Sequence, residues 1–192
     1  AAGEPCYGHV EDQRLASDHF WIEWPGSLLN EGSAAAALQA AEAARALYID
    51  DLGYRFTDQP VVIVLRSVDF GGTAGLTTTR DCEGVGPVPY VTLSVTTWDA
   101  TSGAGVIAHE LAHVAQYAYM GSYGDAVASW LWWMEGHATW LEAQASGDWA
   151  FWRATARGYL NQTRLALAHD LSGFLDPDIS DHMYGTTFVV AA

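Results

Sequence analysis

The stretch HELAHVAQY runs from His109 to Tyr117 and places two histidines four residues apart, with Glu110 directly after the first. On an α-helix, side chains four residues apart lie on one face, one turn above each other. His109 and His113 can therefore converge on one ion, and zinc accepts imidazole nitrogen at about 2.0–2.1 Å. Glu110 is rotated away from this pair, so it can act on a water molecule without being a ligand. The spacing predicts two metal ligands and a general base.

The same spacing also fits a purely structural helix pair, in which the histidines are held in the core by ordinary hydrogen bonds. With 7 histidines in 192 residues, chance gives the HExxH pattern in about one such chain in a hundred. The metal hypothesis is therefore the stronger one.

A catalytic zinc site needs a third protein ligand and an open position for water. The metzincin pattern places a histidine six residues after His113, but Tyr119 stands there, and Gln116 stands where that pattern has glycine. The metzincin arrangement is thus excluded. Two candidates remain, Glu135 in WWMEGHATWLE and Asp181 in DHMYG.

HELAH followed by a helix bearing EGHATW resembles the gluzincin clan of zinc metallopeptidases, and the resemblance covers roughly residues 61–145. EGxAxW is similar to the glutamate-helix motif of the aminopeptidase-like branch. In this clan a glutamate on the second helix completes the site. The resemblance therefore implies zinc ligands His109, His113 and Glu135, with Glu110 as general base. His2Glu sites also accept cobalt or manganese.

The chain departs from the clan in two places. It lacks the GxMEN-type loop with which the clan's aminopeptidases read a substrate's amino terminus, so we expect an endopeptidase. The thermolysin branch has an acidic residue four positions after the ligand glutamate, where this chain has Thr139. An acceptor behind the ligating histidines is still expected on physical grounds. Glu142 and Asp125 are the candidates.

The resemblance also implies a donor that stabilises the oxyanion, because gluzincins place a tyrosine or histidine after the glutamate helix. Tyr184 and His182 are the candidates here, although Tyr184 can also be explained by packing beside Gly185 at a helix start. DxxYG, residues 181–185, is similar to the third-ligand motif of aspzincins. In that alternative Asp181 replaces Glu135 as ligand.

Periodicity predicts the elements that must position these residues. The first thirty residues are expected to be irregular. A helix with Ser33 as N-cap should end near Gly53, and residues 71–79 form either a loop or a weak edge strand. Strands are expected at residues 61–67 and 88–95, and helices at residues 105–120, at residues 126–145 and after residue 148.

This order predicts an α+β fold with helices packed on one side of a sheet. The resemblance makes it zincin-like, with a small mixed β-sheet whose edge strand packs on the HExxH helix. We expect residues 1–192 to form a single domain. Residues 1–120 would make the lobe with the sheet and the HExxH helix. Residues 121–192 would make a helical lobe that carries the third ligand and continues in a longer parent chain.

The amino-acid composition excludes some classes of binding partner for this chain. The balance of 8 Lys+Arg against 23 Asp+Glu gives a net charge of −15, which argues against nucleic acids and anionic membranes. No apolar run reaches the roughly 18 residues of a membrane span, and the first residues do not resemble a signal peptide. Cys6 and Cys82 are expected to form a disulfide in an exported protein.

The leading hypothesis is therefore a secreted zinc endopeptidase that acts on protein or peptide substrates. The alternative from another class is a catalytically silent zincin-like module that binds a partner or a glycan. Bound metal would distinguish the peptidase and the silent module from a purely structural helix pair. Peptidase turnover would distinguish the peptidase from the silent module. The oligomeric state does not follow from the sequence.

Overall fold

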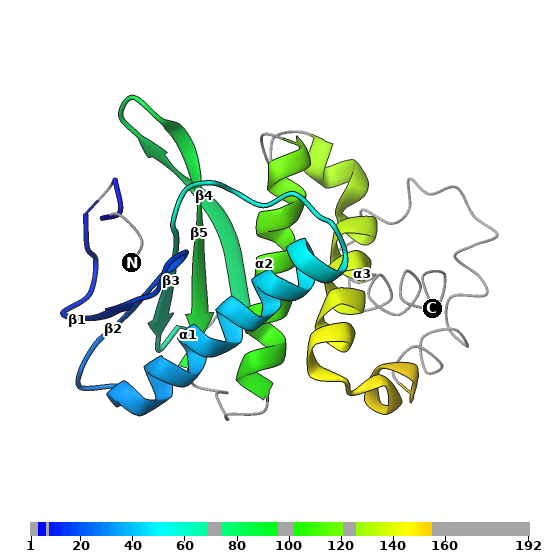
Figure 1. Ribbon diagram of the computed structural model, residues 1–192, viewed down its shortest axis with the longest axis horizontal. Coiled ribbons are helices and arrows are strands. Elements are labelled where there is room, and N and C mark those ends of the chain that lie inside the picture. The colour runs from blue at the N-terminus through cyan, green and yellow to red at the C-terminus, as the bar shows by residue number, and fades with distance from the viewer. Residues whose placement is uncertain (1–3, 7, 69–73, 96–101, 121–125, 155–192) are drawn as a thin grey trace. The chain divides into compact units, whose positions relative to one another are not determined.

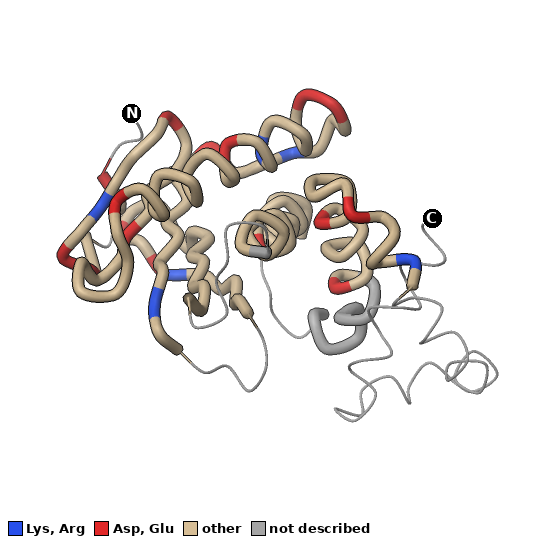
Figure 2. The backbone as a smooth tube through the Cα atoms, turned by 90° about the horizontal axis from the view of Figure 1, so that it is seen from below, with Lys and Arg blue, Asp and Glu red and all other residues tan. Residues whose placement is uncertain are grey.

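The computed structural model describes residues 4–6, 8–68, 74–95, 102–120 and 126–154 (Figure 1). The chain divides into two compact units, residues 1–122 and residues 123–192. The first unit contains the sheet, and the second contains a long helix. Acidic residues occur along the described backbone of both units (Figure 2).

The first unit is built on a five-stranded mixed sheet with strand order β1-β2-β3-β5-β4. Strands β2, β3 and β5 are parallel neighbours, while β1 and β4 are antiparallel to their partners and lie at the two edges. The central strand β3 has the sequence VVIVLR and its apolar residues are fully buried, as expected for a strand covered on both faces. The strands are β1 (Gln13–Ala16), β2 (Phe20–Trp24), β3 (Val61–Arg66), β4 (Gly75–Cys82) and β5 (Gly86–Ser94).

The expectation of an irregular N-terminal region is wrong, because β1 and β2 lie within it. Phe20 and Ile22 are fully buried on β2, which pairs in parallel with β3. Aromatic and β-branched side chains favour strands. The strands contain only four and five residues, too few for alternation to stand out from the neighbouring turns.

Helix α1 (Glu31–Ala46) lies against β2 and against the helix α2 described below. Its alanines form the buried side, namely Ala34, Ala37, Ala41 and Ala44. The N-cap is Asn30 and not Ser33, because the Asn30 side chain accepts a hydrogen bond from the backbone N–H of Ser33 at 2.9 Å. Both residue types suit this position. A π-helical turn, η1 (Leu47–Asp51), follows directly.

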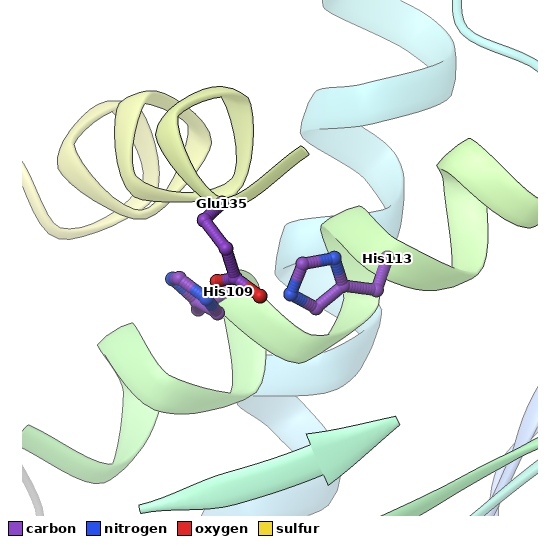
Figure 3. A group of neighbouring side chains, drawn as sticks. All are labelled: His109, His113 and Glu135. Atoms are coloured by element: carbon purple, nitrogen blue, oxygen red, sulfur yellow. The ribbon is translucent and has the colours of Figure 1, made fainter. Parts of the chain in front are cut away.

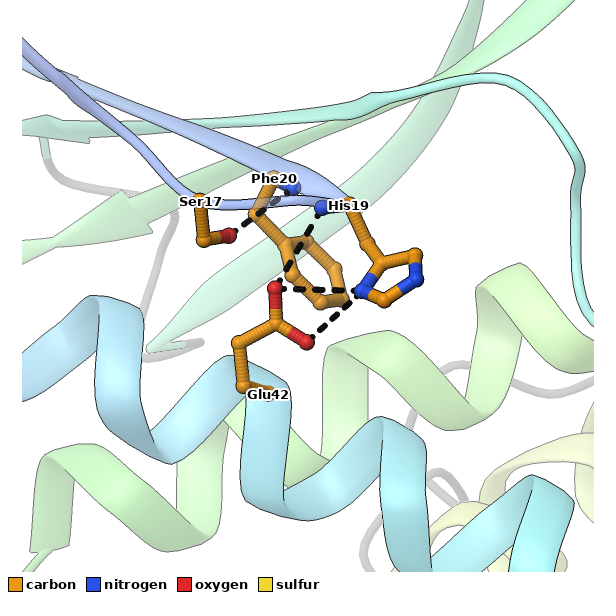
Figure 4. Close-up of polar contacts among 4 residues, drawn as sticks. All are labelled: Ser17, His19, Phe20 and Glu42. Carbon is orange, nitrogen blue, oxygen red and sulfur yellow. Dashed lines mark hydrogen bonds and ion pairs between the residues drawn. The ribbon is translucent and has the colours of Figure 1, made fainter. Parts of the chain in front are cut away.

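Glu42 joins α1 to the turn between β1 and β2 (Figure 4). Its carboxylate accepts a hydrogen bond from the backbone N–H of His19 at 3.3 Å and lies 2.9 Å from His19 Nδ1. The Ser17 hydroxyl accepts a hydrogen bond from the backbone N–H of Phe20 at 3.2 Å in the same turn. The carboxylate thus satisfies turn groups that the sheet leaves without strand partners.

The sheet face opposite the helices is covered by the N-terminal segment. Val62, Val64 and Tyr90 form a cluster there, with Val10 and Trp21 packed on it. The predicted disulfide is confirmed, since Cys6 is bonded to Cys82 at the end of β4, with 5.7 Å between the Cα atoms. The disulfide therefore fastens the N-terminal segment to the edge of the sheet.

A buried carboxylate holds the same segment in place. Glu23 of β2 is fully buried and accepts the backbone N–H groups of Val10 at 2.7 Å and Glu11 at 3.2 Å. His9 Nδ1 lies 2.6 Å from the other carboxylate oxygen. Three hydrogen-bond partners offset the loss of water around this charge.

The predicted helices are confirmed over the described residues. Helix α2 (Ser102–Met120) packs on β4 and β5 in the first unit. Helix α3 (Ala126–Ser146) belongs to the second unit, and residues 149–154 begin a further helical segment. Asp148 caps that segment, because its side chain accepts the backbone N–H of Phe151 at 3.1 Å. None of the described helices is both long and apolar enough to cross a membrane.

Candidate metal centre

Helix α2 carries the two histidines on successive turns. Its buried apolar residues fix the rotation of the helix against the sheet. The imidazole rings of His109 and His113 lie with their centroids 5.1 Å apart, and the ring planes are 77° apart. His113 is only 8% exposed. The predicted convergence of the pair is therefore present. The buried apolar residues are Ile107, Ala108, Leu111, Ala112, Val114 and Ala115.

Two tyrosine hydroxyls link α2 to neighbouring parts of the first unit. The Tyr48 hydroxyl, from η1, donates to the carbonyl oxygen of Ala108 at 2.5 Å, one residue before His109. The Tyr117 hydroxyl donates to the carbonyl oxygen of Pro87 on β5 at 3.1 Å. Burial, and secondarily the charge of Asp81, raises the pKa of Tyr117. The phenol therefore stays protonated and remains a donor.

Glu110 faces the sheet and is 4% exposed. The Thr77 hydroxyl of β4 lies 2.6 Å from Glu110 Oε2 and 3.0 Å from the Glu110 carbonyl oxygen. Thr77 and Gly75 are two residues apart on β4, so they lie on the same face of the sheet. The contact with Glu110 shows that this is the face on which α2 packs. The strand and the helix thus meet at the predicted general base.

Gly75 makes room for the same carboxylate. A Cβ atom at this position would lie 2.6 Å from Glu110 Oε1 and 2.8 Å from Glu110 Cδ. Any side chain here would therefore displace the carboxyl group. In the sequence, glycine and threonine indicated either a loop or an edge strand. The structure has an edge strand whose glycine permits a close approach.

Gln116 contacts His113, although nothing in the sequence pattern had marked it as part of the site. It entered only as a departure from the metzincin pattern. Its side-chain Oε1 lies 2.9 Å from His113 Nδ1, and Gln116 is 4% exposed. Positions three apart on a helix are neighbours, so the spacing from His113 could have pointed to this contact.

The side chains of His109, His113 and Glu135 offer ligand atoms that all lie within 4.8 Å of one another (Figure 3). Glu135 belongs to α3. Two imidazole nitrogens and one carboxylate oxygen form a donor set that suits zinc, and also cobalt or manganese. The chain therefore has a His/His/Glu group that could hold a metal ion.

The remaining predicted residues are placed as follows. Glu142 is half-buried on α3. Asp125, the other candidate acceptor, lies outside the described residues. The same is true of the predicted oxyanion donors, Tyr184 and His182, and of the rival ligand Asp181.

Comparisons with protein-family models, with curated proteins and with solved structures found no match to this chain.

Proposed function

We propose that this protein is a secreted, zinc-dependent endopeptidase of the gluzincin type. His109, His113 and Glu135 hold the zinc ion, and Glu110 is the general base. The observation that carries the proposal is the His/His/Glu group, with the intervening Glu110 held against β4 by Thr77. A purely structural helix pair does not require a third metal-ligating side chain near the two histidines.

Bound zinc would polarise the scissile carbonyl and lower the pKa of water towards about 7. Glu110 accepts the proton of the attacking water and passes it to the leaving amine. Thr77 engages Oε2 of this carboxylate, and we propose that Oε1 is the oxygen that takes the proton. Tyr184 or His182 would donate to the oxyanion, as the resemblance implies.

Two further observations support the zincin-like fold. The sheet is mixed, and its edge strand β4 is antiparallel to β5. This edge strand contacts the HExxH helix through Thr77. Both features agree with the fold that the gluzincin resemblance implies. The Cys6–Cys82 disulfide supports secretion, because disulfides persist mainly in oxidising compartments.

The first test is metal content. We expect about one zinc per purified chain by elemental analysis, removable by a chelator, and sharply lower zinc occupancy in His113→Ala at low free metal. His137→Ala is the matched control, because His137 stacks on Trp140 with an interplanar angle of 13° and is not in the ligand group. Full zinc retention in His113→Ala would overturn the assignment.

Paired variants decide the third ligand. Glu135→Ala should empty the site, while Asp181→Ala should leave zinc bound. The opposite pattern would make Asp181 the ligand and favour the aspzincin alternative.

The second test is turnover. The zinc-loaded parent should cleave a denatured, casein-like substrate pool, and removal of zinc by a chelator should abolish cleavage. Zinc is measured on every sample, so that loss of metal and loss of chemistry are separated. If the zinc-loaded parent cleaves nothing across a broad peptide library, the partner- or glycan-binding alternative replaces the peptidase.

A further inference from the structure

We infer that Gln116 is a positioning residue for the metal. Its side-chain oxygen accepts the Nδ1–H of His113, which leaves Nε2 as the nitrogen that binds the ion. The inference rests on the proposed metal site, but it concerns metal affinity and does not depend on turnover.

The contact is local and protected from water. Gln116 follows His113 by three positions on α2, so the two side chains are neighbours on the helix surface. Oε1 and Nδ1 are 2.9 Å apart, and the two residues are 4% and 8% exposed. At this burial, bulk water competes poorly for either group, so the bond holds the ring in one orientation.

The chemistry of imidazole gives the bond its direction. A neutral imidazole carries one N–H and one lone pair, and a metal takes the lone pair. An amide oxygen can only accept, so Nδ1 must carry the hydrogen. The lone pair is then on Nε2. If the amide donated to Nδ1 instead, the hydrogen would move to Nε2, and that nitrogen could not bind a metal.

The Gln116 amide gives the metal-binding His113 an uncharged hydrogen-bond acceptor. Metal-bound histidines usually donate their other N–H to a carboxylate, a backbone carbonyl or a water, and loss of such a partner lowers metal affinity about 10–100-fold. Gln116 supplies the acceptor without adding a negative charge. Gln116→Glu keeps the acceptor and adds the charge, whereas Gln116→Met keeps the length and removes the acceptor.

The test measures zinc affinity by competition with a zinc-binding dye on the full chain, after stripping and reloading. Gln116→Met should bind zinc about 10–100-fold more weakly than the parent. Gln116→Glu should bind at least as tightly as the parent. Gln116→Leu, which is shorter, serves as a second acceptor-free variant if Gln116→Met does not fold.

Tyr117→Phe is the matched control. It removes a partly buried hydrogen bond made by the next residue of the same helix, but this bond goes to Pro87. If α2 merely needs its buried hydrogen bonds for rigidity, this control should weaken zinc binding as much as Gln116→Met does, and the inference would be overturned. We expect its zinc affinity to stay within about twofold of the parent.

The possible results distinguish failure of this inference from failure of the proposed function. If the parent binds zinc and Gln116→Met binds it equally well, Gln116 has no role in metal binding, while the proposed function stands. If the parent binds no zinc, the proposed function fails and the inference fails with it. If Gln116→Glu binds as weakly as Gln116→Met, the acceptor is not what matters and the inference is wrong.

Discussion

The Thr77 hydroxyl donates to Oε2 of Glu110 at 2.6 Å, and so links the edge strand β4 to the helix that carries the histidines. A hydroxyl has one hydrogen, and the Glu110 carbonyl oxygen is farther away, at 3.0 Å. The shorter bond to the carboxylate is the stronger one, because its acceptor is charged. The bond fixes the predicted general base relative to the sheet.

Thr77→Val should therefore reduce peptidase turnover while zinc stays bound. Valine has the shape of threonine without the donor, and hydrogen bonds to charged groups contribute about 1.5–3 kcal/mol. We expect kcat to fall about tenfold or more, with KM nearly unchanged. Steady-state kinetics with zinc measured on each sample provide the check.

Thr77→Ser is the matched variant, because it restores the hydroxyl. It should recover most of the lost turnover. Equal kcat in Thr77→Val and the parent would show that Glu110 does not need this bond.

Gly75→Ala should disturb the same carboxylate by crowding it. The added Cβ would lie 2.6 Å from Glu110 Oε1, well inside van der Waals contact, so the carboxyl group must move. We expect a large loss of kcat with zinc retained. Leu76→Ala is the control, since Leu76 is exposed on the same strand. If Gly75→Ala is fully active, Glu110 does not work from this position.

The Cys6–Cys82 disulfide should contribute to stability. It joins residues separated by 76 positions, and closing a loop of that length contributes about 4.5 kcal/mol in the chain-entropy model. The double variant Cys6→Ser, Cys82→Ser should therefore unfold at a lower urea concentration than the parent. Thiol titration of the unreduced, denatured parent is the complementary measurement, and two free thiols there would contradict the disulfide.

Glu42 should make part of the stability depend on pH. Burial alone would raise its pKa, but the hydrogen bonds from Ser17 and His19, together with electrostatic attraction to His19, outweigh burial and lower the pKa below its ordinary value of 4.5. A carboxyl whose pKa is lowered in the folded state stabilises the fold above its unfolded-state pKa. That contribution is lost as the pH falls through the folded-state pKa.

The stability difference between the parent and Glu42→Gln should thus be larger at about pH 5.5 than at about pH 3. Urea unfolding at both pH values measures it. Ser17→Ala removes one cause of the lowered pKa and should reduce the difference. If the stability difference between the parent and Glu42→Gln is the same at both pH values, Glu42 does not cause a pH dependence of stability.

The sequence predicted best those features that are determined by residues close together in the chain. His109, Glu110 and His113 are set by one helix, so their spacing alone placed them on α2. The HELAH helix has a long helical periodicity, and β3 is a continuous run of mostly β-branched apolar residues, so both were predicted. These features need no knowledge of what packs against them.

The pairing of short strands and the close approach of backbone to side chain between distant segments were not predictable. Strand β2 became a strand because β3 lies beside it, and its five residues carry little pattern of their own. The role of Gly75 follows from the β4–β5 register, which places it under Glu110. Gln116 was within reach of the sequence, but an amide three residues from a histidine is too common to stand out.

The decisive catalytic prediction is Glu110→Gln, which should keep zinc and the fold while removing peptidase activity. Glutamine has nearly the same volume and can still accept a hydrogen bond from Thr77 through its amide oxygen. It cannot take a proton from water, and loss of a general base lowers the rate about 10²–10⁴-fold. The deficit should lie in kcat, with substrate binding largely kept. Tyr184→Phe should show a smaller loss of the same kind if Tyr184 is the oxyanion donor. Cleavage of the casein-like pool by both variants, with zinc measured on each, provides the test. A Glu110→Gln protein that cleaves as fast as the parent would show that Glu110 is not the base.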